Sequence, residues 1–278
     1  MVPNITLNNG VEIPQLGFGT YLISPNDTVE AVTTALKTGY RHIDTAQMYG
    51  NEAEVGQAIA ESGLSRAEVF ITTKLNNGYH KRDDALYATD VSLQRLGVDQ
   101  VDLYLIHWPL PMIGVDYVET WKAMIDVLND GKARAIGVSN FLPKHLDRII
   151  DATGVVPAAN QVQSHPYSPN NVTRQADKKY GIATEAWAPI ARGEILSDPT
   201  IVEIAKRIGR TPAQVVLRWH IQRGDIVIPK SIHPVRIAEN FDIFDFNLSN
   251  ADMNVISNLD TGVPADPNPD TFDYIPAN

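Results

Sequence analysis

Gly39-Tyr40-Arg41-His42-Ile43-Asp44-Thr45-Ala46-Gln47-Met48-Tyr49-Gly50-Asn51-Glu52 is the stretch around which the rest of this chain is organised. Gly39 predicts the end of a helix, because glycine readily takes the left-handed conformation at a helix C-terminus. Residues 42–44 then predict a very short strand, and Asn51 is a fair N-cap for the next helix. The turn between them carries a carboxylate, Asp44, and a phenol, Tyr49. We therefore expect later strands to supply partners to these two groups.

The composition restricts the class of protein. The chain has 278 residues, of which 44% are hydrophobic, so it can bury a sizeable core. Its net charge of −10, without a basic stripe, makes it a poor binder of nucleic acid. The absence of cysteine excludes disulfides and thiolate catalysis. No signal peptide or membrane-spanning run is visible, so we expect a cytoplasmic protein without a membrane partner.

Strands and helices alternate along the chain. Asn9-Gly10 predicts a two-residue turn between strands at 5–7 and 11–13, a hairpin that would cover one end of a barrel. Further strands are predicted at 16–20, 42–44, 69–75, 101–107, 133–138, 158–162, 182–187 and 225–228. Helices are predicted at 28–38, 53–62, 82–96, 118–129, 143–152, 171–180, 199–208, 212–222, 236–241 and 251–259. Residues 261–278 hold four prolines and predict a loop or tail.

This alternation predicts an α/β protein with a parallel sheet. About eight strand–helix pairs without a linker fit one domain over residues 1–278, a closed (β/α)8 TIM barrel with an N-terminal β-hairpin and extra C-terminal helices and loop. A doubly wound open sheet is the alternative. That fold usually carries G-x-G-x-x-G after its first strand, whereas Gly17-Phe18-Gly19 lacks the third glycine.

Polar side chains occur at the ends of three consecutive predicted strands. Asp44, Lys74 and His107 lie at these ends, and Tyr49 lies just beyond the first. Each alone has an ordinary structural explanation, but in a barrel the C-terminal strand ends share one mouth. An ammonium beside a phenol lowers its pKa from about 10. Together the four groups predict a proton donor aimed at a carbonyl that accepts a hydride.

A second cluster follows the last predicted strand. Lys230, Ser231 and Arg236 offer a point charge, a hydroxyl and a planar fork, which suit phosphate oxygens near a helix N-terminus. A solvated helix start explains the same residues equally well. No metal site is expected, because the seven histidines are scattered and no H-E-x-x-H motif occurs.

With these motifs the chain resembles the aldo-keto reductase superfamily, and its short loops and Trp187 resemble the bacterial 2,5-diketo-D-gluconate reductase branch. The resemblance implies a barrel that binds NADPH without a Rossmann domain. It also implies reduction of aldehydes, ketones, dicarbonyls or ketosugars to alcohols. The matching segments appear in family order between about Ile5 and Leu259: 39–46 with 49–52, 105–109, 137–141, 160–161, and 228–231 with Arg236, Glu239 and Asn240.

The resemblance also implies a role for each matching residue. Tyr49 would be the general acid, tuned by Lys74 and Asp44, while His107 would orient the carbonyl. The implied cofactor-binding residues are Gly19, Thr20, Asp44, Ser139, Asn140, Gln161, Trp187, Ala188, Pro189, Ile190, Lys230, Ser231, Arg236, Glu239 and Asn240. Of these, Trp187 would stack on the nicotinamide, 139, 140 and 161 would hold its carboxamide, and 230, 231 and 236 the 2′-phosphate. The implied substrate wall is Tyr21, Leu22, Tyr49, Asn76, His107, Trp108 and Phe272, with Tyr274 nearby.

The chain departs from the family pattern at three places. Asn76 replaces a frequent tryptophan, Gln163 replaces a frequent glutamate, and residues 188–191 lack a glycine common in that loop. Two other functions stay open from the sequence. One is a Schiff-base aldolase that uses Lys74 as its nucleophile, and the other is a non-catalytic NADPH-binding sensor. A monomer that acts on a small-molecule carbonyl is the default expectation.

Overall fold

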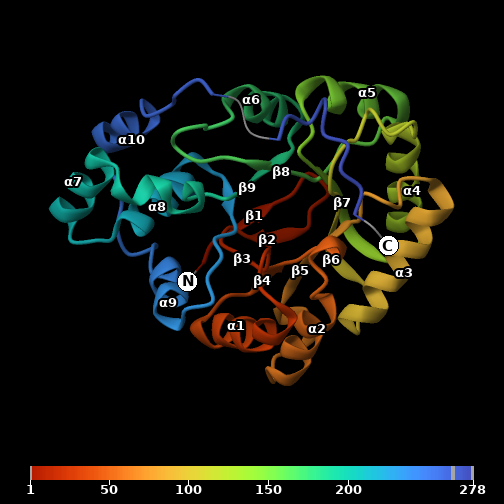
Figure 1. Ribbon diagram of the computed structural model, residues 1–278, viewed down its shortest axis with the longest axis horizontal. Helices are drawn as coiled ribbons and strands as arrows, with labels where there is room; N and C mark the ends of the chain where they lie inside the picture. The colour runs from red at the N-terminus through yellow and green to blue at the C-terminus, as the bar shows by residue number, and fades with distance from the viewer. Residues whose placement is uncertain (1, 264–266, 277–278) are drawn as a thin grey trace.

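The computed structural model describes residues 2–263 and 267–276. Within them, eight parallel strands form one sheet in the order β10-β9-β8-β7-β6-β5-β4-β3, and the helices surround this sheet (Figure 1). The sheet closes on itself, because Leu16 and Val227 form a parallel bridge and the Gly17 N–H donates to the Val227 carbonyl at 2.8 Å. The predicted (β/α)8 barrel is confirmed.

The elements alternate as the sequence predicted. The strands are β1 (Asn4–Thr6), β2 (Glu12–Pro14), β3 (Phe18–Gly19), β4 (His42–Asp44), β5 (Phe70–Leu75), β6 (Val101–Ile106), β7 (Ala133–Ser139), β8 (Ala159–Gln163), β9 (Ala183–Trp187) and β10 (Ile226–Val227). The α-helices are α1 (Pro25–Thr38), α2 (Glu52–Glu61), α3 (Arg82–Leu96), α4 (Tyr117–Asn129), α5 (Pro143–Thr153), α6 (Asn171–Tyr180), α7 (Pro199–Ile208), α8 (Pro212–Arg223), α9 (Pro234–Phe241) and α10 (Asn250–Ser257). Short 3-10 helices are η1 (Gln47–Tyr49), η2 (Arg66–Glu68) and η3 (Ala191–Ser197).

Helix boundaries follow the capping residues closely. The bounds of α3, α6 and α7 match the prediction residue for residue. Helix α1 begins at Pro25 rather than at the predicted Thr28, because Ser24 takes the N-cap position and proline suits the first helical turn. Two helices, α7 and α8, connect β9 to β10, and α10 follows the last barrel helix, so the extra C-terminal helix is also confirmed.

The N-terminal hairpin covers one end of the barrel. Ile5 pairs with Ile13, and the side chains of Leu7 and Ile13 pack on residues from the N-terminal ends of several barrel strands. The prediction of Asn9-Gly10 as the central turn residues is wrong. The Gly10 N–H donates to the Leu7 carbonyl at 2.9 Å, so the central residues are 8 and 9, and Gly10 follows them with φ +86°. The glycine is used at the left-handed bulge position rather than within the turn.

The opening stretch joins several elements. Gly39 ends α1 with φ +123°, and a Cβ there would lie 2.8 Å from Cζ of Phe241, so only glycine fits. Asn51 occupies the N-cap position of α2, but its side chain forms no cap, contrary to the prediction. Its amide instead donates to the Thr20 carbonyl at 3.1 Å, and its Oδ1 accepts from the Thr45 hydroxyl at 2.9 Å. Asn51 therefore fixes the turn that carries Tyr49 to the loop after β3.

The C-terminal segment runs past α6 and α5 (Figure 1), and its contacts place it near the C-terminal end of β5. Asn77, just after β5, donates to the Tyr274 carbonyl at 2.9 Å, and Lys144 of α5 lies 2.8 Å from Asp270. The described part of residues 261–278 contains no helix or strand, as predicted, while 264–266 and 277–278 lie outside the described residues. In the described residues, no helix combines the length and the apolar character needed to cross a bilayer.

Candidate active site

Three of the four groups predicted at the strand ends are joined by direct contacts. The Lys74 ammonium donates to Asp44 Oδ1 at 2.7 Å, to the Thr45 carbonyl at 2.9 Å and to the Tyr49 hydroxyl at 3.4 Å. Asp44 ends β4 and Lys74 lies near the end of the neighbouring β5, while Tyr49 closes η1. Lys74 is fully buried and Asp44 is 2% exposed. The barrel therefore encloses an ion pair with a phenol directly against it.

Burial decides the charge of these groups. It raises the pKa of Tyr49 to about 12, although Lys74 opposes the effect. The sequence-based expectation of a lowered phenol pKa is thus not met in this site, because removal from water outweighs the nearby ammonium. Burial also acts to lower the pKa of Lys74, but Asp44 and Tyr49 outweigh it and hold that pKa above its ordinary value. At neutral pH the site holds a protonated phenol beside an ammonium.

His107 faces the phenol as a neutral imidazole. The rings of Tyr49 and His107 lie 5.7 Å apart at 73°. Burial, and after it the charge of Lys74, holds the pKa of His107 well below its usual range. His107 Nδ1 has no hydrogen-bond partner among the described residues. All four predicted groups therefore meet at one mouth, as the strand-end argument required. Among the described residues, no three His, Asp or Glu side chains are grouped to hold a metal ion.

The residues that resemblance assigns to the carboxamide are hydrogen-bonded to one another. Gln161 Nε2 donates to Asp44 Oδ2 at 2.7 Å, and the Ser139 hydroxyl donates to the Gln161 carbonyl at 2.8 Å. Asn140, with φ +62°, donates from Nδ2 to the His107 carbonyl and accepts at Oδ1 from the Trp187 indole at 2.9 Å. The indole plane of Trp187 is thus fixed against the same cluster that contacts Asp44.

Two of the three residues of the predicted phosphate cluster are accessible, whereas Ser231 is buried. Lys230 and Arg236 are exposed, and within the described residues neither forms an ion pair. The hydroxyl of Ser231 accepts the His233 N–H at 3.0 Å at the start of α9, and Glu239 and Asn240 lie farther along that helix. Where β3 meets the end of β10, a Cβ at Gly19 would lie 3.0 Å from the Ile228 carbonyl, so the backbones of these two strands approach closely.

Two further predicted groups have structural contacts. Thr20 is fully buried and its hydroxyl donates to the Asp44 carbonyl at 3.0 Å. Asn76 accepts the Gly78 N–H at 3.0 Å and donates its own N–H to Gln47, so it shapes its loop. The missing glycine in the loop after β9 leaves Ala188 with φ +49°. Pro189 and Ile190 follow it, buried and half-buried.

Aromatic and aliphatic side chains form the outer mouth. Tyr21 stacks 5.0 Å from the Tyr49 ring and is 53% exposed, and Leu22 beside it is 74% exposed. The Phe272 ring of the C-terminal segment lies 4.1 Å from the Trp108 ring at an angle of 34°. Tyr274 continues this wall with its ring 6.4 Å from that of Phe272. The approach to Tyr49 is therefore mainly apolar.

A second carboxyl lies inside the barrel, and the sequence analysis did not single it out. Glu185 of β9 is fully buried, and neither carboxyl oxygen has a hydrogen-bond partner among the described residues. The nearest basic group is His42, with Nε2 at 3.8 Å. Burial lowers the pKa of His42 to about 4. Burial, reinforced by Asp44, raises the pKa of Glu185 to about 8. The only sequence signal was a charged residue inside a predicted buried strand.

The raised pKa of Glu185 predicts that this residue contributes less to the stability of the protein as pH rises. The unfolded carboxyl ionises near its ordinary pKa of about 4.3, whereas the folded one keeps its proton up to about 8. Between these values the folded state holds the extra proton, so the contribution of Glu185 to the free energy of unfolding decreases by about 1.4 kcal/mol per pH unit. We expect Glu185→Gln to remove this slope. Urea unfolding at pH 5 and pH 8 measures it.

The matched control is Glu203→Gln on the exposed face of α7, which should change the free energy of unfolding equally at both pH values. A difference between Glu185→Gln and the unmodified protein that is the same at pH 5 and pH 8 would show that Glu185 is already ionised in the fold.

Comparisons with known proteins agree with this architecture. The family model "Aldo/keto reductase family" matches residues 15–261. An aldo-keto reductase from Mycolicibacterium smegmatis is 53% identical over 274 residues, covering 99% of each chain. A crystal structure of an aldo/keto reductase from Brucella melitensis has a TM-score of 0.90 and 51% identity, covering 94% of this chain and all of that one. A mutant of Gox0644 in complex with NADPH has a TM-score of 0.94 and 43% identity, covering 99% and 100%.

The match extends over nearly the whole chain, in sequence and in fold. The chain therefore belongs to the aldo/keto reductase family.

Proposed function

We propose that this protein reduces the carbonyl group of small aldehydes and ketones to alcohols with NADPH, and that Tyr49 is the general acid. The observation that carries the proposal is the contact of Lys74 with both Asp44 and the Tyr49 hydroxyl at the barrel mouth, with neutral His107 across from it. The family and the NADPH-bound relative support the reaction class and the cofactor.

Each residue of the mouth has a distinct task in this reaction. Tyr49 stays protonated at neutral pH and gives its proton to the carbonyl oxygen as negative charge develops there. Lys74 stabilises the phenolate that remains, and Asp44 keeps the lysine charged and in place. His107, a neutral imidazole, donates its N–H to the carbonyl oxygen and holds it in line with the phenol. NADPH, when bound, supplies the hydride to the carbonyl carbon.

The residues present fit this cofactor. The half-buried indole of Trp187, held by its hydrogen bond to Asn140, offers a platform for a flat ring at the end of β9. Lys230 and Arg236 are exposed and form no ion pair with any described residue, so both are available to the 2′-phosphate of an extended dinucleotide. We propose that Glu239 and Asn240 contact the adenine end, and that residues 188–190 cover the pyrophosphate.

The mouth favours uncharged carbonyl compounds. Tyr21, Leu22, Trp108 and Phe272 present rings and an aliphatic chain, which suits aromatic or aliphatic aldehydes, ketones and dicarbonyls more than polar ketosugars. We expect an aromatic aldehyde to give a higher kcat/KM than 2,5-diketo-D-gluconate. A panel of substrates followed by NADPH absorbance tests both the function and this order, and no turnover with any carbonyl would overturn the proposal.

The geometry does not favour a Schiff-base aldolase. Such an enzyme needs a neutral lysine with room for a substrate carbon. Lys74 is fully buried, makes three hydrogen bonds and has a pKa above its ordinary value. Borohydride in the presence of a carbonyl substrate should therefore leave Lys74 unmodified, as mass spectrometry of the peptide would show.

Arg236→Ala is expected to weaken NADPH binding by about 10- to 100-fold, since a hydrogen bond to a charged group contributes about 1.5–3 kcal/mol. NADH, which lacks the 2′-phosphate, should bind the variant as well as it binds the unmodified protein. Fluorescence titration with both cofactors measures the two dissociation constants. Lys206→Ala, an exposed change on α7, is the control for loss of a positive charge. Equal losses for NADPH and NADH would place the 2′-phosphate elsewhere.

A further inference from the structure

The segment that follows Trp187 has a strained backbone. Ala188, Ala191 and Arg192 all have left-handed conformations, with φ of +49°, +48° and +52°, although none is glycine. Such conformations persist only where the surroundings enforce them. Within the segment, the Ala191 N–H donates to the Ala188 carbonyl at 2.9 Å, and the Gly193 N–H donates to the Ile190 carbonyl at 2.8 Å. These local turns leave the carbonyl of Pro189 for an outside partner.

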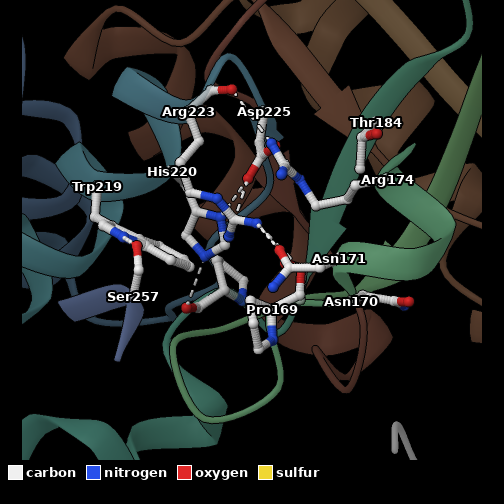
Figure 2. Close-up of polar contacts among 12 residues, drawn as sticks. Pro169, Asn170, Asn171, Arg174, Thr184, Trp219, His220, Arg223, Asp225 and Ser257 are labelled. Carbon is white, nitrogen blue, oxygen red and sulfur yellow. Dashed lines mark hydrogen bonds and ion pairs between the residues drawn. The ribbon is translucent and has the colours of Figure 1, made fainter. Parts of the chain in front are cut away.

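That partner is His220 of α8. Its Nε2 lies 3.2 Å from the Pro189 carbonyl, and its Nδ1 lies 3.0 Å from Asp225 Oδ2. His220 is fully buried and Asp225 is 1% exposed. Figure 2 shows the imidazole between Asp225 and the chain below it, with Arg174 and Arg223 converging on the same carboxylate. The ring therefore links the start of β10 to the segment after β9.

Both neighbours of the imidazole are acceptors. A carbonyl and a carboxylate each require an N–H, so the two bonds together need a proton on both ring nitrogens. Burial outweighs the hydrogen bond and the charge of Asp225 and holds the pKa of His220 below its ordinary value, so the neutral ring gives its one N–H to one of these two acceptors. Burial likewise opposes ionisation of Asp225, but His220, Arg223 and Arg174 outweigh it and hold the pKa of Asp225 below its ordinary value. The aspartate is thus a fixed anion that orients the ring.

Arg174 is the main anchor of this anion. Its guanidinium donates to Asp225 Oδ1 through Nε at 2.9 Å and through Nη2 at 2.6 Å. Arg223 lies 3.6 Å from the other oxygen and stacks 4.0 Å above the Trp219 ring. The orientation of His220 is therefore set by α6 and α8 together, and not by the segment that it contacts.

We infer that His220 and Asp225 form a latch that holds residues 188–193 in their left-handed conformation before the cofactor binds. His220 is then a positioning residue for NADPH. The inference rests on the proposed role of this segment in covering the cofactor. Apolar packing fixes the far end, where Ala191 and Ile195 join the cluster around Trp219. The end next to Trp187 depends on the Pro189 carbonyl, since proline has no N–H to contribute.

Two variants separate the two arms of the imidazole. Asparagine places its amide nitrogen where Nδ1 lies and cannot reach Pro189, whereas glutamine extends its amide to the position of Nε2. We expect His220→Asn to open the segment and His220→Gln to keep it closed. Ser257→Ala is the matched control. Ser257 of α10 accepts the indole N–H of Trp219 at 3.1 Å, and Trp219 lies next to His220 on α8, so the change removes a hydrogen bond to the same helix without touching the Pro189 carbonyl.

Limited trypsin digestion without cofactor reads the segment directly, because Arg192 is exposed. Cleavage after Arg192 should be about tenfold faster in His220→Asn and unchanged in His220→Gln and Ser257→Ala. The dissociation constant for NADPH should rise about tenfold only in His220→Asn, the upper end of the loss expected for one neutral hydrogen bond of about 0.5–1.5 kcal/mol. kcat at saturating NADPH should stay the same.

The outcomes distinguish the latch from the proposed function. Equal cleavage in all variants, or equal effects of asparagine and glutamine, would overturn the latch. Faster cleavage with an unchanged NADPH dissociation constant would overturn the link to the cofactor. If the unmodified protein failed to bind NADPH at all, the proposed function would be wrong, while the trypsin result would still decide whether the latch exists.

Discussion

Tyr49→Phe is expected to lower kcat for carbonyl reduction by about 10²- to 10⁴-fold, the range for losing a positioned general acid. Burial raises the pKa of Tyr49 to about 12, so the phenol holds its proton at neutral pH. Among the described residues, no other side-chain hydroxyl contacts the Lys74 ammonium. Phenylalanine keeps the ring that stacks on Tyr21 and faces His107. Pre-steady-state measurement of NADPH oxidation gives the chemical step.

The dissociation constant for NADPH should stay within about twofold in Tyr49→Phe, since only one hydroxyl is removed. Tyr21→Phe is the matched control. Its ring lies 5.0 Å from that of Tyr49 but is 53% exposed, and removal of its hydroxyl should leave kcat within about threefold. Should Tyr49→Phe retain most of the activity while Tyr21→Phe loses it, the general acid has been assigned to the wrong phenol.

Lys74→Met is expected to destabilise the protein by about 3–5 kcal/mol and to abolish carbonyl reduction. The loss of stability arises because Asp44, 2% exposed, is left buried without the ammonium that lies 2.7 Å away. The loss of activity arises because the phenolate formed by Tyr49 has no counter-charge. Urea unfolding measures the first effect, and NADPH absorbance with an aromatic aldehyde measures the second.

The double variant Asp44→Asn with Lys74→Met separates the two effects. Neutral side chains of similar size remove the buried charge, so most of the lost stability should return, while activity should not. A double-mutant cycle quantifies this coupling. If the two single changes instead add without coupling, the ion pair does not stabilise the fold, and the position of Lys74 next to Tyr49 has to be explained by packing alone.

The barrel could be predicted from the sequence because the hydrophobic periodicity, the turn residues and the helix-capping residues all indicated the same alternating strands and helices. Asp44, Lys74 and His107 could be found together because parallel strands bring their C-terminal ends to one face, a rule that needs no side-chain detail. Burial could not be read in the same way. The pKa of Tyr49 moves upward and not downward because the net shift depends on how much water the fold removes, which no spacing of residues reveals.

The contacts that the sequence did not predict join residues far apart in the chain. Glu185 meets His42 only because β9 and β4 enclose one interior, and His220 meets Pro189 only because α8 packs under the loop after β9. The predictions for Asn51 and Gly10 were wrong for a different reason. Asparagine suits a helix cap, but the Asn51 amide donates to the Thr20 carbonyl instead. Glycine suits a hairpin turn, but the backbone hydrogen bonds of the hairpin place Gly10 one residue after the central pair.

The seam between Leu16 and Val227 has a consequence for how molecules of this protein meet at high concentration. A sheet that ends in a free strand offers a row of unpaired amides on which another chain can grow a fibril. Here the first and last strands of the barrel, each two residues long, occupy each other's open side. Among the described residues, the barrel sheet therefore has no open edge at this junction, and open strand edges are left to the short β1–β2 hairpin.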